Sequence, residues 1–202
     1  MLTPKTSIRP QAGPEPLRDR AGDALEYQLD DPLKRILIPA EQLSARVREL
    51  GEEVAATYQG TVPLLVSVLK GGVVFLSDLM RAIRIPHHID FLQLSSYAGG
   101  TMTSGTVRLL SDLGTNIGGR DVLIVEDIVD TGLTLRYLLK QLEIRQPRSL
   151  RVCCLLNKAA AREVEVPLDF VGFEIPNEFV VGYGLDYDEK YRNLPYIGVL
   201  DL

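Results

Sequence analysis

The hydrophobic positions along the chain follow two alternating patterns. Short runs such as VPLLVSVL at 62–69 are almost wholly apolar, which is typical of strands buried on both faces of a sheet. Between these runs, apolar residues recur every three or four positions, as on one face of a helix. Over 40–59 the spacings are four, three and four, set by Leu43, Val47, Leu50 and Val54. The chain is therefore predicted to alternate buried strands with amphipathic helices.

These patterns place strands and helices in succession through the middle of the chain. Strands are expected at 33–39, 62–69, 87–97, 121–127 and 149–158, with a further strand at the end of 98–113. Helices are expected at 40–59, 73–83 and 134–146. This alternation predicts an α/β fold with a parallel twisted sheet and helices on both faces. Ligands of such sheets bind beyond the carboxyl ends of the strands.

The two ends of the chain depart from this alternation. Residues 1–30 are rich in proline, glycine and charge and show no sustained apolar period, so we expect a disordered tail. Residues 159–202 hold many aromatic residues, prolines and glycines, and no helix of useful length. We therefore predict an α/β core at 31–158 and a small C-terminal cap, or hood, of short strands and loops at 159–202.

Composition narrows the classes of function. The 202 residues carry a formal charge of −5, which gives the surface no electrostatic preference for nucleic acid. No apolar run approaches the roughly 18 residues of a membrane span, and the N-terminus lacks the pattern of a signal peptide. Neither a nucleic acid nor a membrane is expected as a partner.

Two pairs of reactive residue types are predicted to have structural roles. Cys153 and Cys154 are adjacent within the apolar run LRVCCLLN, and a disulfide between neighbours is strained. We predict two reduced cysteines on a core strand, as in a cytoplasmic protein. His87 and His88 have no cysteine or third histidine near them in the sequence, so they are predicted to be surface residues and not metal ligands.

The stretch VLIVEDIVDTGLTL at 122–135 carries the strongest chemical signal. An apolar strand runs into two acids, Glu126 and Asp127, and a turn of small residues leads into a helix near Thr134. The free N–H groups and positive end of that helix favour a dianionic phosphate, which Gly132 allows the backbone to approach closely. The motif is neither a Walker loop nor a dinucleotide-binding glycine motif.

Carboxylates beside a phosphate repel it unless they bind something else. A vicinal diol donates two hydrogen bonds to one carboxylate, and a bound Mg²⁺ is a second target. A sugar phosphate offers both the phosphate for the turn and the hydroxyls for the acids. The alternative is an ordinary solvated turn after a strand, which does not explain why acids and small residues occur in this order.

This stretch resembles the signature of the type I phosphoribosyltransferases, which is an apolar strand, two acids and a D-T-G-x-T loop. The resemblance implies that Glu126 and Asp127 hold the ribose hydroxyls of phosphoribosyl pyrophosphate and take part in binding Mg²⁺. It also implies a 5′-phosphate loop of Asp130, Thr131, Gly132, Leu133 and Thr134. Some relatives carry lysine where this chain has leucine, but a site built from backbone N–H groups does not depend on that side chain.

Further segments are similar to the hypoxanthine-guanine branch of that family, and the resemblance spans roughly 33–200. SVLKGGVVFLSDLMRAI implies a pyrophosphate loop at Lys70 and Gly71, whose preceding peptide is often cis in that branch. SSYAGGTMTSGTVRLLSDL implies a mobile lid with Ser96 and Tyr97 at its moving end.

The C-terminal segments are similar to the parts of that branch that bind the purine. LLNK implies that Lys158 contacts the exocyclic O6 of the base. FVVGYGLDYDEKYRNLPYIGVL implies that Phe179 stacks on the purine and that the Val180 backbone contacts its edge. It also implies that Asp186 meets Mg²⁺ and Arg192 meets pyrophosphate. Taken alone, the lysine is better explained as a solvated residue and the phenylalanine as core, so their order around the phosphate motif carries the functional interpretation.

The activity implied by the resemblance is purine salvage. The phosphoribosyl group of phosphoribosyl pyrophosphate would move to N9 of hypoxanthine or guanine, giving IMP or GMP and pyrophosphate. Asp130, close to the base, would hydrogen-bond N7 and act as the catalytic acid–base residue. The alternatives are a preference for xanthine and a nucleotide-binding regulator with the same fold. The resemblance further implies a homodimer or homotetramer.

Overall fold

The structure is a computed structural model that describes residues 33–96 and 107–201. The described strands are β1 (Leu33–Ile38), β2 (Leu64–Leu69), β3 (His88–Ser96), β4 (Val107–Ser111), β5 (Asp121–Val129), β6 (Ser149–Asn157), β7 (Phe170–Glu174), β8 (Val180–Val181) and β9 (Ile197–Leu200). The described helices are α1 (Ala40–Thr57), α2 (Gly72–Ala82) and α3 (Leu133–Glu143), with a 3₁₀ turn at Ala159–Ala161. The expected tail at 1–30 and Tyr97 of the expected lid lie outside the described residues.

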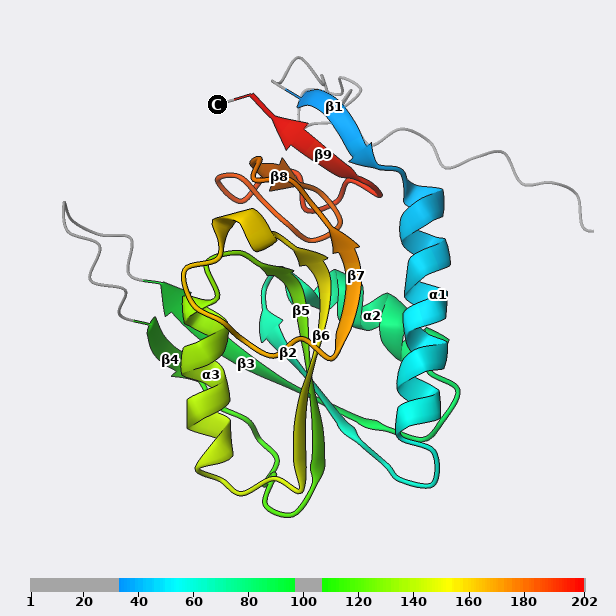
Figure 1. The fold of residues 1–202 in the computed structure, drawn as a ribbon, viewed down its shortest axis with the longest axis vertical. Helices are drawn as coiled ribbons and strands as arrows, with labels where there is room; N and C mark the ends of the chain where they lie inside the picture. The colour runs from blue at the N-terminus through cyan, green and yellow to red at the C-terminus, as the bar shows by residue number, and fades with distance from the viewer. Residues whose placement is uncertain (1–32, 97–106, 202) are drawn as a thin grey trace, which may run out of the picture. The chain divides into compact units, whose positions relative to one another are not determined.

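A six-stranded sheet in the order β4-β3-β2-β5-β6-β7 forms the centre of the fold (Figure 1). Neighbouring strands from β3 to β7 are parallel, whereas the edge strand β4 runs antiparallel to β3. α1 and α2 pack on one face of the sheet and α3 packs on the other. The predicted α/β fold with helices on both faces is confirmed. The antiparallel edge is a correction to a wholly parallel sheet: β3 and β4 are closer in the sequence than the dozen or more residues that a crossover between parallel neighbours needs.

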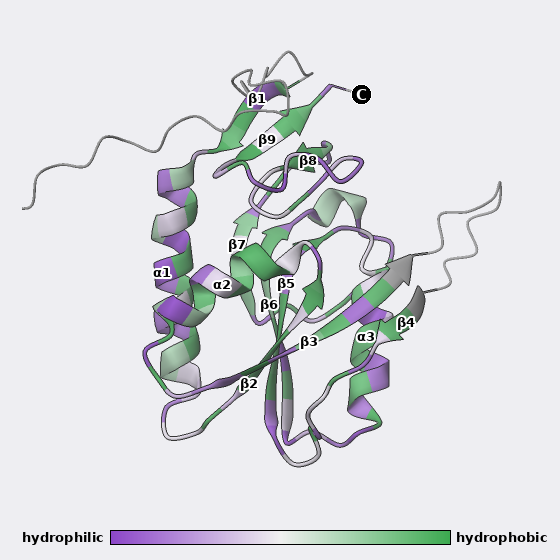
Figure 2. Ribbon diagram, turned by 180° about the vertical axis from the view of Figure 1, so that it is seen from behind, coloured by the Kyte–Doolittle hydropathy of each residue, from purple (hydrophilic) through white to green (hydrophobic). Residues whose placement is uncertain are grey.

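The central position of β5 explains its unbroken apolar run. Leu123 and Val125 pack toward α1 and α2, whereas Val122 and Ile124 pack toward α3, and all four are fully buried. Figure 2 shows β5 and β6 as largely hydrophobic and α1 as a mixture of hydrophobic and hydrophilic bands. A strand that is buried on both faces needs apolar residues at every position, so its first polar residues mark the edge of the sheet.

A second sheet has the antiparallel order β1-β9-β8. From here on, the hood means this sheet together with the loops between β8 and β9. Two assignments made from the sequence are therefore wrong. β1 was placed in the core but pairs with β9 of the hood, and β7 was placed in the cap but pairs with β6 of the main sheet. Phe170 of β7 joins the core on the α1 side together with its register partner Cys153. The apolar pattern identifies a strand, but the partner of that strand depends on which edge the rest of the fold leaves open.

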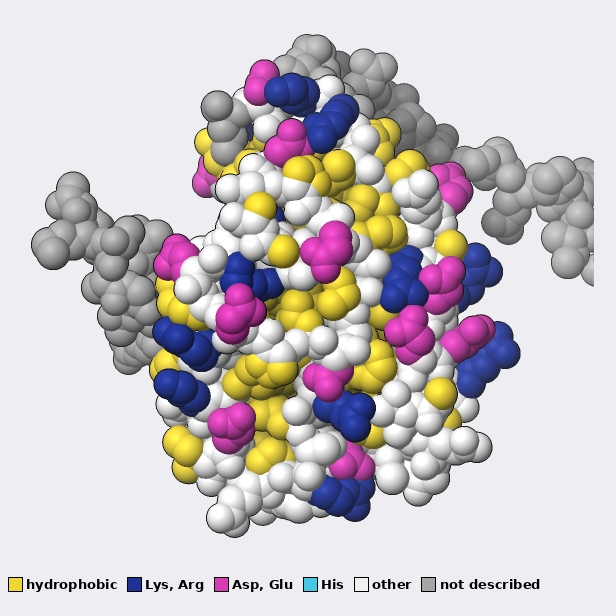
Figure 3. Space-filling view, viewed as in Figure 1, with side chains coloured by type: hydrophobic (Ala, Val, Ile, Leu, Met, Phe, Trp, Pro, Cys, Tyr) yellow, Lys and Arg dark blue, Asp and Glu magenta, His cyan; other side chains and the backbone are white. Residues whose placement is uncertain are grey.

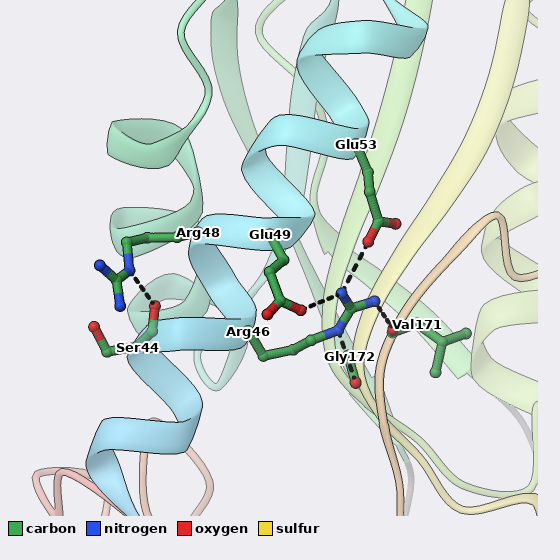
Figure 4. Close-up of polar contacts among 7 residues, drawn as sticks. All are labelled: Ser44, Arg46, Arg48, Glu49, Glu53, Val171 and Gly172. Carbon is green, nitrogen blue, oxygen red and sulfur yellow. Dashed lines mark hydrogen bonds and ion pairs between the residues drawn. The ribbon is translucent and has the colours of Figure 1, made fainter.

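Arg46 on α1 holds the edge strand β7 (Figure 4). Its Nε donates to the Gly172 carbonyl at 3.1 Å and its Nη2 donates to the Val171 carbonyl at 2.8 Å. Its Nη1 donates to Glu49 and Glu53 of the same helix, both at 2.8 Å. The guanidinium thus satisfies backbone acceptors that an edge strand leaves unpaired and fixes β7 against the helix.

The fold accounts for the reactive residues away from the sheet edge. Cys153 and Cys154 are free and buried on opposite faces of β6, as predicted, and burial raises the pKa of both thiols. His88 is exposed and His87 is half-buried, as expected of residues near the surface. Among the described helices, none is long and apolar enough to cross a membrane. On the face shown in Figure 3, acidic and basic side chains are interspersed.

Candidate active site

The polar residues of the stretch at 122–135 meet where β5 ends and α3 begins. Gly132 has a left-handed conformation with φ of 83°, and α3 starts at the next residue, Leu133. A Cβ at Gly132 would lie 2.6 Å from the Val164 carbonyl, so glycine is needed here for both its conformation and its size. Gly132 offers no side-chain cap, and the Leu133 N–H donates only a long hydrogen bond of 3.4 Å to Thr131 Oγ1. The first N–H groups of α3 are therefore available to an anion.

A pocket of about 270 Å³ lies at this junction. Its lining combines carboxylates, small polar residues and apolar residues from β2, β5 and α3: Val68, Glu126, Asp127, Ile128, Val129, Asp130, Thr131, Gly132, Thr134 and Leu135. The predicted ribose and phosphate residues thus share one cavity, apart from Leu133, which does not line it. The apolar residues Val68 and Ile128 were not predicted, because nothing in their residue type separates a pocket wall from the core.

The two acids at the end of β5 are buried. Glu126 is 8% exposed, and burial, together with the negative charge of Asp127, raises the pKa of Glu126 well above its usual range. Burial also raises the pKa of Asp127 to about 6, against the opposing effects of the Ile128 N–H and the charge of Arg192. Hydrogen-bond donors or a cation stabilise the ionised form of such carboxyls. Sugar hydroxyls and a metal ion are ligands of this kind.

Asp130 and Lys158 form a pair at the pocket. Lys158 Nζ lies 3.3 Å from Asp130 Oδ2, with the lysine side chain 8% exposed and the aspartate 48% exposed. The adjacent ends of β5 and β6 bring them together, and the Lys158 backbone nitrogen donates to the Val129 carbonyl at 3.0 Å. A lysine so deeply buried is not the solvated strand-end residue that its position alone suggested. Its ammonium group pairs with Asp130, which lines the pocket.

The loop after β2 contacts the acids of β5 and also the hood. The Leu69–Lys70 peptide is cis, as is frequent in the family branch that the sequence resembles. A Cβ at Gly71 would overlap the carboxylate of Asp127, so the loop backbone and this acid are in close contact. A Cβ at Gly184 of the hood would likewise overlap the Gly71 carbonyl. Gly71 of the predicted pyrophosphate loop therefore contacts both the predicted ribose acid Asp127 and the hood.

Arg192 connects the charged residues of the hood. Its Nη1 donates to the Gly184 carbonyl at 2.8 Å, and its Nη2 lies 2.8 Å from Asp186 and 3.2 Å from Glu189. The Nε of Arg192 is buried and has no hydrogen-bond partner in the described parts of the chain. Lys70 Nζ lies 2.9 Å from Glu189. Glu189 thus connects three predicted site residues, Lys70, Asp186 and Arg192. Glu189 itself was not predicted, because one more acid in a charged turn does not stand out in the sequence.

The predicted purine residues of the hood lie on β8 and beside it. Phe179 is 41% exposed, so it is not the core residue that its sequence context suggested. Its ring meets Tyr187 edge-on, with the ring centroids 5.6 Å apart and an interplanar angle of 82°. Val180 lies in β8, opposite Val199 of β9. Ser96, assigned to the lid, is the last residue of β3, and only its backbone is described.

The carboxylates do not form a complete metal site by themselves. Across residues 33–96 and 107–201, no group of three His, Cys, Asp or Glu side chains could hold a metal ion, so Glu126, Asp127 and Asp186 do not form a protein cage. Mg²⁺ is commonly held by one or two carboxylates together with substrate phosphates. The residues present fit an ion that is shared with a substrate.

Comparison with known proteins assigns the family. Residues 38–188 match the model of the phosphoribosyl transferase domain. The chain belongs to the phosphoribosyltransferase family. The hypoxanthine-guanine phosphoribosyltransferase of Mycobacterium avium is 55% identical over 175 residues, which cover 84% of this chain and 86% of that protein. The protein of that name from Bacillus subtilis is 48% identical over 168 residues, covering 83% and 93% of the two chains.

The solved structures agree with this assignment. The crystal structure of a hypoxanthine phosphoribosyltransferase from Staphylococcus aureus matches with a TM-score of 0.80 and 45% identity, covering 84% of this chain and 92% of that one. The type I phosphoribosyltransferase fold predicted from the D-T-G-x-T loop is therefore confirmed, as is the prediction of a transferase enzyme.

Proposed function

We propose that this phosphoribosyltransferase joins phosphoribosyl pyrophosphate to N9 of hypoxanthine or guanine, forming IMP or GMP and pyrophosphate. The observation that carries the proposal is the buried Lys158, paired with Asp130, an acid that lines the pocket at the start of α3. An ammonium group only donates hydrogen bonds, so it fits the carbonyl O6 that hypoxanthine and guanine share. Adenine presents an amino group at that position and offers the lysine no acceptor there.

The other pocket residues fit the sugar phosphate. The N–H groups at the start of α3, with the hydroxyls of Thr131 and Thr134, hold the 5′-phosphate. Glu126 and Asp127 accept hydrogen bonds from the ribose hydroxyls, which keeps the two buried carboxyls ionised. Phe179 stacks on the purine, and the Val180 backbone contacts its edge.

The displacement of pyrophosphate by the purine separates charge between the ribose and the leaving pyrophosphate. The N9–C1′ bond forms as the bond to pyrophosphate breaks, with inversion at C1′, positive charge on the sugar and negative charge on the leaving group. Lys70 and Arg192 stabilise the leaving group, while Asp130 accepts the hydrogen bond from N7 and helps to remove the purine proton. Mg²⁺ held by Glu126, Asp127, Asp186 and the substrate would add positive charge at the pyrophosphate. Closure of the lid at Ser96 and Tyr97 would exclude water.

A spectrophotometric assay of the purified protein tests the proposal. Phosphoribosyl pyrophosphate and Mg²⁺ are supplied with hypoxanthine, guanine, xanthine, adenine or orotate in turn. We expect IMP and GMP to form, and the reaction to stop when EDTA removes the ion. Turnover of xanthine alone would reassign the base. Nucleotide binding without turnover of any base would favour the regulator with the same fold.

We further propose a cytoplasmic homodimer or homotetramer, in line with the family resemblance. Light scattering after gel filtration measures the mass, and we expect two or four times the 22.4 kDa of one chain.

Replacing Lys158 with alanine is expected to weaken purine binding selectively. A hydrogen bond from a charged donor contributes roughly 1.5–3 kcal/mol, so the KM for hypoxanthine should rise about tenfold or more. The KM for phosphoribosyl pyrophosphate should change little. Steady-state kinetics measures both, and Lys140→Ala, at an exposed lysine of α3, is the matched control. An unchanged KM for hypoxanthine would mean that Lys158 does not bind the base.

A further inference from the structure

Glu189 forms ion pairs with Lys70 and Arg192, the two cations that we assign to pyrophosphate. Its Oε1 lies 2.9 Å from Lys70 Nζ, and its Oε2 lies 3.2 Å from Arg192 Nη2. The pairing with the lysine is the leading cause that lowers the pKa of Glu189, followed by the pairing with the arginine. One carboxylate therefore forms ion pairs with both groups that are proposed to meet the leaving group, and Asp186 is a second partner of Arg192.

The backbone holds Glu189 in this place at a conformational cost. Asp188 and Glu189 both have positive φ, 51° and 61°, at the tip of a turn closed by hydrogen bonds in both directions between Tyr187 and Lys190. Such a turn favours glycine and asparagine, and a long side chain is uncommon in the left-handed region. The Glu189 nitrogen also donates to Asp186 Oδ2 at 2.9 Å. The left-handed backbone costs free energy, and it places the Glu189 carboxylate beside two cations. This cost is independent support for a functional role of Glu189.

A bound polyanion can displace Glu189 from its ion pairs with Lys70 and Arg192. Lys70 and Glu189 are 59% and 64% exposed, so their ion pair is weak and open to competition from a polyanion. Arg192 retains a buried Nε that has no partner in the described residues. A bound pyrophosphate would take over both cations and leave the Glu189 carboxylate close to its own negative charge.

We infer that Glu189 is an internal substitute for pyrophosphate. It pairs with Lys70 and shares Arg192 with Asp186, yields both cations to the pyrophosphate group of the substrate, and then opposes that group through like charge. The result is weaker product binding and faster release. Glu189 acts through Lys70 and Arg192, so it is a positioning residue. This inference rests on the proposed function, because that function assigns the two cations to pyrophosphate.

Replacing Glu189 with glutamine tests the inference, because it keeps the shape of the side chain and removes its charge. The inhibition constant of inorganic pyrophosphate, measured against phosphoribosyl pyrophosphate, should fall by about 3- to 10-fold, the range expected for two exposed ion pairs. Titration calorimetry with pyrophosphate and excess Mg²⁺ should show the same change in Kd. The difference from the parent should shrink at high salt, because exposed charges are screened. Glu189→Gly, which also relieves the left-handed conformation, should tighten binding equally.

Glu49→Gln is the matched control. Glu49 is 62% exposed and pairs with Arg46 on α1, so this variant removes a similar ion pair away from the pocket. It should leave pyrophosphate binding unchanged. Unchanged or weaker pyrophosphate binding in Glu189→Gln would overturn the inference while the parent still turns over hypoxanthine. A parent that turns over no base would overturn the proposed function, and the inference with it.

Discussion

Replacing Asp130 with asparagine is expected to lower kcat by about 10²- to 10⁴-fold, the usual range for general acid–base assistance. The side chain lines the pocket and pairs with the buried Lys158, next to the place proposed for the purine. Asparagine keeps the size and can still accept a hydrogen bond from the ammonium group. It loses the negative charge and the ability to take up a proton from the purine.

The kinetic pattern separates this role from substrate binding. The KM for phosphoribosyl pyrophosphate should change little in Asp130→Asn, because the N–H groups at the start of α3 remain. A loss confined to kcat is the mark of an interaction made mainly in the transition state. Asp127→Asn is the contrasting variant and should weaken phosphoribosyl pyrophosphate binding instead. If Asp130→Asn keeps kcat within about threefold of the parent, the residue is not the acid–base group.

Replacing Gly71 with alanine is expected to reduce kcat/KM for phosphoribosyl pyrophosphate by about 100-fold, the loss that a misplacement of roughly 1 Å causes in an active site. The added methyl group would overlap the Asp127 carboxylate. That acid, the Lys70 loop or both must then move, and each is assigned to phosphoribosyl pyrophosphate. Steady-state kinetics with varied phosphoribosyl pyrophosphate measures the effect.

The control for this variant is Gly114→Ala. A Cβ at Gly114 would make only an ordinary contact, 3.9 Å from an oxygen of Asp90. It should keep the parent's kinetics and melting temperature. Thermal unfolding of Gly71→Ala shows whether the protein remains folded. Kinetics close to the parent's in a folded Gly71→Ala would mean that the close contact between the loop and Asp127 does not set the geometry of the site.

Most residues that line the pocket at the start of α3 come from one continuous stretch that stood out in the sequence. The apolar run of β5, the acids Glu126 and Asp127, and the glycine before α3 are neighbours in the chain. Their arrangement follows from short-range causes: burial of the strand, the conformational freedom of Gly132 and the unpaired N–H groups of a helix start. Elements with strong periodicity, such as α1, were predictable for the same reason, because each residue in them is placed by its near neighbours.

Contacts between distant segments were decided only by the tertiary structure. The ion pair of Lys70 with Glu189 spans 119 positions, and the close approach of Gly71 to Asp127 joins the ends of two parallel strands. The placement of β1 in the hood and of β7 in the main sheet also depends on which strand edges the rest of the chain leaves open. By itself, the sequence determined the alternation of strands and helices and the local turn between β5 and α3, since both depend on interactions between near neighbours. The tertiary structure decided which strands pair, how deeply Lys158 is buried and where Glu189 lies. These features depend on how distant segments pack together to bury apolar surface.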